Sequence, residues 1–142
     1  MNRSALEAAC AAAVRYLDAL PARAVAASAD AAAMRAALGG PLPEEGDAPA
    51  RVVEDLARKA DPGVVASAGP RFFGFVVGGS LPAAVGADWL ASAWDQNAGL
   101  FVLSPAAAVV EETVAGWMKE LFGLPPGSSM GKIGRASCRE RV

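Results

Sequence analysis

The side chains best suited to form a binding surface gather in one stretch, residues 69–112. It holds four of the five phenylalanines and two of the three tryptophans of the chain: Phe72, Phe73, Phe75, Phe101, Trp89 and Trp94. Large aromatic side chains supply much of the area that a small domain can bury, and glycines beside them allow close approach of the backbone. The stretch is therefore either the core of a helical domain or one wall of a pocket whose other walls lie elsewhere.

Residues suited to acid–base or metal chemistry are scarce. The 142 residues include no histidine, which removes imidazole metal sites and the commonest general base. Cys10 and Cys138 lie far apart and lack the spacing of a metal site. Glu111 and Glu112 are adjacent on an expected helix, so they point in different directions and are expected to be solvated charges. The sequence thus identifies no catalytic residue and no metal ligands.

Charge and hydropathy exclude several classes of partner. The formal net charge is −2 and the basic residues are scattered, unlike the basic stripe of a nucleic-acid-binding protein. No apolar run reaches the roughly 18 residues needed to span a bilayer, and no signal peptide is recognised. We therefore expect neither a nucleic acid nor a membrane as partner. Because the two cysteines do not suggest a disulfide framework, we expect a protein of the reducing cytoplasm. The apolar residues exceed what an ordinary surface needs, which suggests that a partner or further chain covers part of them.

Three short helices are predicted before residue 64. The first spans Ser4–Leu20, with Ser4 and Glu7 at the spacing of a capping box. Its apolar face is formed by Leu6, Cys10, Ala13, Val14 and Leu17. Pro21 ends this helix, because proline lacks the N–H that would continue it.

The second and third helices have equally clear boundaries. Ser28 or Asp30 caps the second helix, and Gly39 stops it. Asp47 is the expected N-cap of the third, with Pro49 just inside. The apolar face of the third helix is Val52, Val53, Leu56 and Ala60. These helices form either a small α-helical domain or an arm that wraps another subunit, since short Ala-rich helices bury little alone.

The remainder is predicted to hold an irregular segment and two further helices. Residues 64–77 are extended or irregular, and a helix then runs from Leu81–Pro82 to about Asp95. The last helix begins with Ser104 as N-cap and Pro105 as its first residue, and it runs to about Phe122. Gly123 is the expected C-cap.

The final ten residues, Ile133–Val142, differ in kind. They read IGRASCRERV, with three arginines and no apolar period. The string resembles translated sequencing-adapter DNA over its whole length. A genuine basic tail that binds nucleic acid or membrane is the alternative. We expect an artefact, with the native sequence stopping near Gly131 and residues 132–142 forming a non-native tail.

The order of short motifs resembles the N-terminal part of the group II pyridoxal-phosphate-dependent decarboxylases. The motifs are Pro70-Arg71-Phe72-Phe73, Ala87-Asp88-Trp89-Leu90, Asn97, Ser104-Pro105-Ala106 with Glu111, and Leu124-Pro125. The family includes the aromatic-amino-acid, glutamate and histidine decarboxylases. No single motif is diagnostic, but their order and spacing make the resemblance fairly specific.

The resemblance implies a homodimeric enzyme of fold type I, the aspartate-aminotransferase-like α/β fold. This chain would be mainly α, consisting of an N-terminal helical arm and the first helices of that fold. Residues 1–63 would be the dimerisation arm, and residues 64–131 the start of the large domain. The arm would pack against the partner subunit.

The resemblance also implies which residues meet the substrate. Phe75, Val76 and Gly78 would bind the substrate on one wall of the pocket. Asn97 and Phe101 would belong to a loop that reaches the active site of the neighbouring subunit. Phe72 and Phe73 are expected to serve packing. The apolar pair at 75 and 76 favours an aromatic or hydrophobic L-amino acid, because a buried carboxylate would need a partner.

The activity implied is removal of the amino-acid carboxylate as CO2, with pyridoxal 5′-phosphate as cofactor. The lysines Lys59, Lys119 and Lys132 all lack the family's Schiff-base context and are expected to be surface charges. No cofactor-binding residue is therefore expected within the chain, which should be inactive alone. The competing interpretation is a helical interaction module without chemistry.

Overall fold

A computed structural model describes residues 3–97 and 99–131. The predicted non-native tail, residues 132–142, lies outside the described residues and includes Lys132. The adapter origin of the tail therefore stays a prediction. Contacts divide the chain into two units, Met1–Pro82 and Ala83–Val142. The predicted domain boundary after residue 63 concerns the intact enzyme and stays a prediction. Residues 64–82 belong by contact to the first unit.

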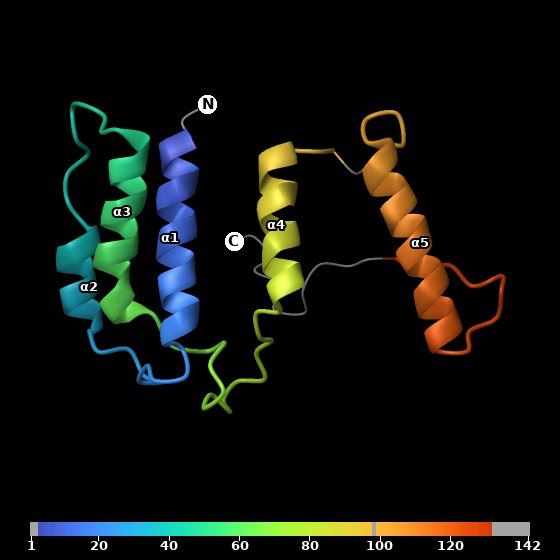
Figure 1. The fold of residues 1–142 in the computed structure, drawn as a ribbon, viewed down its shortest axis with the longest axis horizontal. Helices are drawn as coiled ribbons and strands as arrows, with labels where there is room; N and C mark the ends of the chain where they lie inside the picture. Colours follow the sequence, from blue (N-terminus) through green and yellow to red (C-terminus); the bar gives the residue numbers. More distant parts are fainter. Residues whose placement is uncertain (1–2, 98, 132–142) are drawn as a thin grey trace. The chain divides into compact units, whose positions relative to one another are not determined.

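All the regular secondary structure of the described residues is helical, with no strand among them. The helices are α1 (Arg3–Ala19), α2 (Ala31–Leu38), α3 (Pro49–Ala60), α4 (Pro82–Trp94) and α5 (Pro105–Leu121), and a short 3₁₀ turn, η1 (Asp61–Gly63), follows α3 (Figure 1). The prediction of a mainly α chain is confirmed. None of the helices in residues 3–131 combines the length and apolar character needed to cross a membrane.

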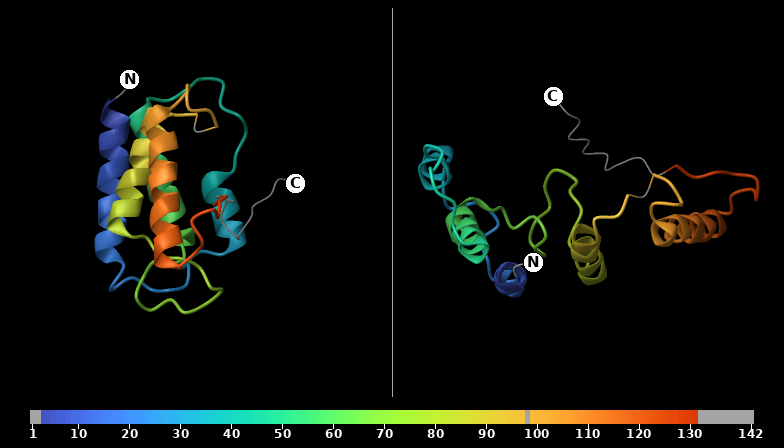
Figure 2. Two further views of the ribbon diagram at one scale, coloured as in Figure 1. Left: turned by 90° about the vertical axis from the view of Figure 1, so that its right-hand side faces the viewer. Right: turned by 90° about the horizontal axis from the view of Figure 1, so that it is seen from above.

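In the first unit, α3 lies between α1 and α2 (Figure 2). The half-buried stripe of α1 is made largely of alanines, with Tyr16 near its end. Of the predicted apolar face, Ala13 belongs to this stripe, whereas Leu6, Cys10, Val14 and Leu17 are all exposed. Small alanine side chains let two helix backbones approach closely, so they occupy the α1–α3 contact and the larger side chains face outward.

The capping predictions for the arm had mixed outcomes. Asp30 caps α2 as predicted, because its Oδ1 accepts from the Ala33 N–H at 2.8 Å. The prediction for α3 was wrong: Ala48 is the N-cap, and Asp47 instead pairs with Arg51 at 3.7 Å. Pro49 fixes the first helical position, which leaves Asp47 one residue too early to cap.

Two further details of the arm differ from prediction. Helix α1 begins at Arg3, so Ser4 lies inside its first turn, and Glu7 pairs with Arg3 at 3.2 Å. The predicted face of α3 is split, because Val52 and Leu56 are exposed whereas Val53 and Ala60 are half-buried. Both α1 and α3 therefore carry large apolar side chains that find no cover within this unit.

The second unit contains α4 and α5 with the loop between them. Ser104 is buried and caps α5, its Oγ accepting from the Ala107 N–H at 3.3 Å. At the other end Gly123 adopts φ +62°, and the Leu124 N–H donates to the Lys119 carbonyl at 2.9 Å. These bonds form a Schellman motif, the C-cap for which glycine was predicted.

The two helices of this unit share little contact in the described structure. Their largest apolar side chains are exposed, namely Trp89, Leu90, Trp94, Val109, Val110, Trp117 and Leu121. Both ends of α5 are therefore defined by local bonds, whereas these large apolar side chains of α4 and α5 have no core to enter within the described residues.

Candidate functional site

The predicted substrate-binding residues lie on a loop, residues 70–81, between η1 and α4. Phe75 and Val76 both adopt left-handed backbone conformations, with φ of 59° and 49°. A β-branched residue rarely adopts this conformation, because its Cβ crowds the backbone. Such strain persists where surrounding structure enforces it, and it is concentrated at functional sites. Asp95 is the third non-glycine residue with positive φ in the described chain. It directly follows α4, and aspartate tolerates the left-handed conformation better than most residues.

The turn presents its apolar side chains outward. Phe75 is 91% exposed and Val76 is fully exposed, so neither contributes to a core within the first unit. Gly78 is also exposed, two residues after the turn, and all three predicted residues thus share one loop. Phe73 is 92% exposed and packs against nothing within the described residues, so its packing role stays a prediction, whereas Phe72 is half-buried. The turn can form one wall of a pocket but does not enclose one itself.

The base of the loop is anchored to the arm. Ala66 is buried, and its N–H donates to the Val25 carbonyl at 3.0 Å. Gly69 lies against Leu20, where a Cβ would meet the Leu20 side chain at 3.7 Å and the Ala66 carbonyl oxygen at 3.1 Å. Arg71 donates from Nη2 to the carbonyl of Arg23. The chain therefore enters the strained turn from a fixed point.

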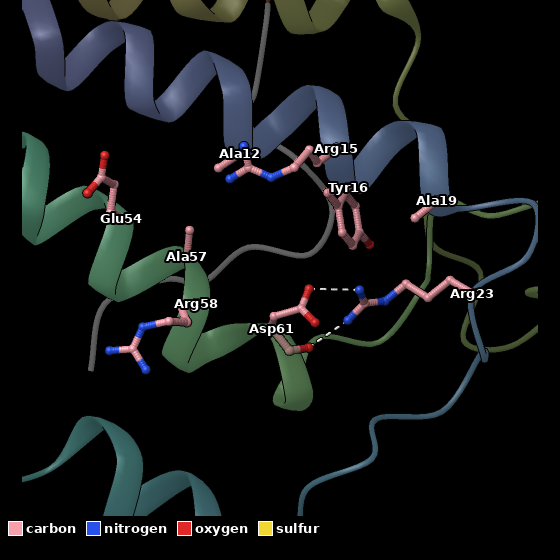
Figure 3. A pocket seen from close by; sticks show the side chains of 9 residues that line it. All are labelled: Ala12, Arg15, Tyr16, Ala19, Arg23, Glu54, Ala57, Arg58 and Asp61. Carbon is pink, nitrogen blue, oxygen red and sulfur yellow. Dashed lines mark hydrogen bonds and ion pairs between the residues drawn. The ribbon is translucent and has the colours of Figure 1, made fainter.

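Arg23 connects this base to the end of α3 (Figure 3). Its Nη1 donates to the Asp61 Oδ1 at 2.7 Å, and its Nη2 donates to the Asp61 carbonyl at 2.6 Å. The guanidinium also lies 5.2 Å from the centre of the Tyr16 ring, in the range of a cation–π contact. These groups sit in a groove of about 610 Å³ between α1 and α3, lined also by Ala12, Arg15, Glu54, Ala57 and Arg58.

The residues predicted to serve a neighbouring subunit lie in the second unit, on the loop between α4 and α5. Asn97 uses its side chain locally, because its Oδ1 accepts from the Gly99 N–H at 2.9 Å. Phe101 is exposed on a turn closed by the bond from the Ser104 N–H to the Leu100 carbonyl, 3.2 Å long. Asn97 and Phe101 thus share one loop, separate in sequence from the Phe75–Val76 turn.

The other polar residues of the ranges 3–97 and 99–131 show no catalytic arrangement. Lys59 Nζ lies 3.6 Å from Asp55 Oδ2, and Lys119 Nζ donates to the Pro126 carbonyl at 3.5 Å, so both are local surface contacts. The hydrogen bond from Arg58, followed by the positive charges of Lys59 and Arg58, lowers the pKa of Asp55. Glu111 and Glu112 are exposed, as predicted. In the described residues no cluster of His, Cys, Asp or Glu side chains is suited to a metal.

Comparison with known proteins supplies the family. Residues 32–138 match the pyridoxal-dependent decarboxylase conserved domain, which is most of the chain. The chain belongs to this family. The match includes α2–α5 and the 70–81 loop, and it extends into the predicted tail. No curated protein and no solved structure gives a significant match.

Membership of the pyridoxal-dependent decarboxylase family confirms the predicted relationship at this level and disfavours a helical module without chemistry. The family implies pyridoxal phosphate as cofactor. The described residues do not fit the cofactor, because Lys59 and Lys119 are engaged at the surface and the N-terminus of α5 is capped by Ser104. We therefore derive no chemical step through the cofactor from these residues.

Two features of this decarboxylase-family chain escaped sequence reasoning. The Arg23–Asp61–Arg71 connection joins residues 38 and 48 positions apart, which no local pattern indicates. The one sequence feature that pointed to this connection was the position of Arg71 within the Pro-Arg-Phe-Phe motif. The left-handed turn at Phe75 and Val76 also lacked its usual signal, since glycine normally occupies such positions.

Proposed function

We propose that this chain is the N-terminal part of a group II pyridoxal-phosphate-dependent decarboxylase that releases CO2 from an aromatic or hydrophobic L-amino acid. The observation that carries the proposal is the strained, exposed turn at Phe75 and Val76, which lies within the family-matched residues. Apolar side chains held outward in an unfavourable backbone conformation suit recognition of an apolar ligand. The cofactor would be held by residues outside those described, and a cytoplasmic location remains part of the proposal.

The charge around the turn supports an apolar substrate side chain. Arg71 is the ionisable residue of the 70–81 loop, and its guanidinium bonds to the main chain of Arg23. A substrate side chain with its own carboxylate would need a charged or amide partner once buried. Phe75, Val76 and Gly78 offer none. We therefore assign these three residues to the wall that contacts the substrate side chain.

This assignment is tested by replacing Phe75 in the full-length enzyme. Phe75→Ala removes an aromatic contact, and we expect a fall of about 10- to 100-fold in kcat/KM for aromatic amino acids, measured as CO2 release. Phe73→Ala is the matched control, because Phe73 is equally exposed but lacks the left-handed backbone. Equal losses in the two variants, or an unchanged kcat/KM for Phe75→Ala, would argue against the assignment.

We further propose that the enzyme is a homodimer joined through the N-terminal helices, with Asn97 and Phe101 serving the partner's pocket. The exposed side chains of Leu6, Val14 and Leu17 form a stripe on α1 that suits burial against a second chain. The double variant Leu6→Glu, Val14→Glu should dissociate the dimer in sedimentation experiments. A dimer of unchanged stability would remove α1 from the interface.

The isolated 142-residue chain is proposed to be inactive. Neither lysine of the described residues lines the groove between α1 and α3, and both make local surface contacts. The purified chain mixed with the cofactor should therefore show no new absorbance band of a lysine imine and no CO2 release. A stoichiometric imine resistant to dialysis would contradict this part of the proposal.

A further inference from the structure

We propose that Arg23, Asp61 and Arg71 are positioning residues that set the place of the Phe75–Val76 turn relative to the helical arm. The inference rests on the proposed function of that turn in substrate binding. None of the three side chains is proposed to touch the substrate. They act through the backbone that leads into the turn.

The link between α1 and α2, residues 20–30, is the centre of this connection. On one side its Ser28 and Ala29 N–H groups donate to the Pro62 carbonyl, at 2.9 and 3.0 Å. On the other side its Val25 carbonyl accepts from the Ala66 N–H at 3.0 Å. The link therefore holds both η1 and the base of the loop by main-chain bonds.

Arg23 strengthens this connection through its side chain. The guanidinium donates to both the carboxylate and the carbonyl of Asp61, which fixes its orientation as well as its position. The Arg23 side chain is 18% exposed and that of Asp61 is 53% exposed, so the pair is shielded from solvent on the arginine side only. The Tyr16 ring covers one face, and the Tyr16 hydroxyl donates to the Val65 carbonyl at 3.4 Å. The Arg23 side chain thus joins α1 and η1 directly, and Tyr16 extends the connection to residue 65.

Arg71 brings the loop to the same point. Its guanidinium donates to the Arg23 carbonyl, and the Phe72 N–H donates to the Gly69 carbonyl at 3.2 Å in a tight turn. Phe75 follows four residues after Arg71, a reach of at most about 14 Å of extended chain. A displacement at Arg71 is therefore passed on to the residues proposed to meet the substrate.

The consequence for catalysis is specific. The proposed wall contacts the substrate side chain, remote from the bond that breaks, so a shifted wall should weaken binding of substrate and transition state alike. Loss of such binding raises KM and leaves kcat nearly unchanged. A positioning role therefore predicts a change in KM and in preference between side chains.

The first test measures the connection without activity. In the full-length protein, Arg71→Met removes the hydrogen bond but keeps an apolar stem, and hydrogen exchange of the Ala66 and Phe72 amides should become about tenfold faster. Arg71→Lys retains one donor and should restore part of the protection. Arg58→Gln is the control, because Arg58 pairs with Asp55 three residues away and its side chain is 68% exposed.

The second test measures the consequence. Arg71→Met and Arg23→Lys should raise KM for aromatic amino acids several-fold while kcat changes less than about twofold, since lysine lacks the fork that reaches both Asp61 oxygens. If the Ala66 and Phe72 amides exchange no faster in Arg71→Met than in Arg58→Gln, the positioning role of Arg71 is overturned. Faster exchange with an unchanged KM would overturn the link to the substrate. If the wild-type enzyme decarboxylates no amino acid, the proposed function fails, and the exchange result still decides whether the arm holds the turn.

Discussion

The hydrogen bonds within the first unit differ in sequence range from those within the second unit. In Met1–Pro82, side-chain hydrogen bonds join residues 34 to 49 positions apart, through Tyr16, Arg23, Ser28 and Arg71. In the described part of Ala83–Val142, the side-chain bonds span seven residues or fewer. The first unit also buries Leu20 and Ala66, whereas Ser104 is the buried residue described in the second.

The difference indicates what each unit requires from its surroundings. Long-range bonds and a buried alanine give the first unit tertiary structure of its own, although it is modest. In the second unit α5 is capped at both ends, but local caps do not replace a core, and most helix stability in proteins comes from packing of an apolar face. We expect α4 and α5 to acquire their packing from the rest of the proposed enzyme.

The largest expected difference between the two units comes from placing a larger side chain at the buried Ala66. Ala66 is buried against the arm, so Ala66→Leu should lower the free energy of unfolding by about 1–3 kcal/mol, measured by urea denaturation. Ala106→Leu is the matched change at an exposed position near the start of α5, and it should stay within about 0.5 kcal/mol of wild type. If the two variants lose equal stability, the first unit has no tighter core than the second.

A smaller effect is expected at the cap of α5. Ser104→Ala leaves the Ala107 N–H without its acceptor, at a cost of about 1 kcal/mol, and the exchange of the first amides of α5 should accelerate. Ser92→Ala, at an exposed position inside α4, supplies the control and should leave helicity unchanged. Slow exchange in Ser104→Ala would mean that tertiary packing, rather than the cap, holds the start of α5.

The smallest effect concerns a local ion pair of the arm. Because its folded-state pKa is lowered, Asp55 contributes stability that is present above its unfolded pKa, about 3.9, and is lost as pH falls through the lower folded value. Asp55→Asn should therefore have a slightly lower urea midpoint than wild type at pH 7. The two midpoints should converge in acid. A gap that widens as pH falls would reverse this sign.

Much of the local structure was predictable from sequence because its causes are local. Pro49, Pro82 and Pro105 each mark the first residue of a helix, Gly39 is the C-cap of α2, and Gly123 follows the C-cap of α5. Proline and glycine act through backbone geometry that needs no tertiary context. The irregular segment after residue 63 was also predicted correctly.

The faces that pack were not predictable to the same degree. Periodicity identifies Leu6, Val14 and Leu17 as the apolar side of α1, but the chain packs the alanine side against α3. A helix can carry two surfaces that each suit burial, and its sequence does not say which one meets which partner. The substrate-side residues came from family resemblance, whereas their strained backbone came from the structure alone.

The bond at the base of the loop has a consequence for how this protein tolerates change. Arg71 is held by the main-chain carbonyl of residue 23, an acceptor that every amino acid provides. A new side chain at position 23 alters the pairing with Asp61 but leaves that acceptor in place. Substitutions at position 71 would therefore remove this hydrogen bond, whereas substitutions at position 23 would keep it. A mutational scan would thus underestimate the contribution of residue 23 to holding the loop.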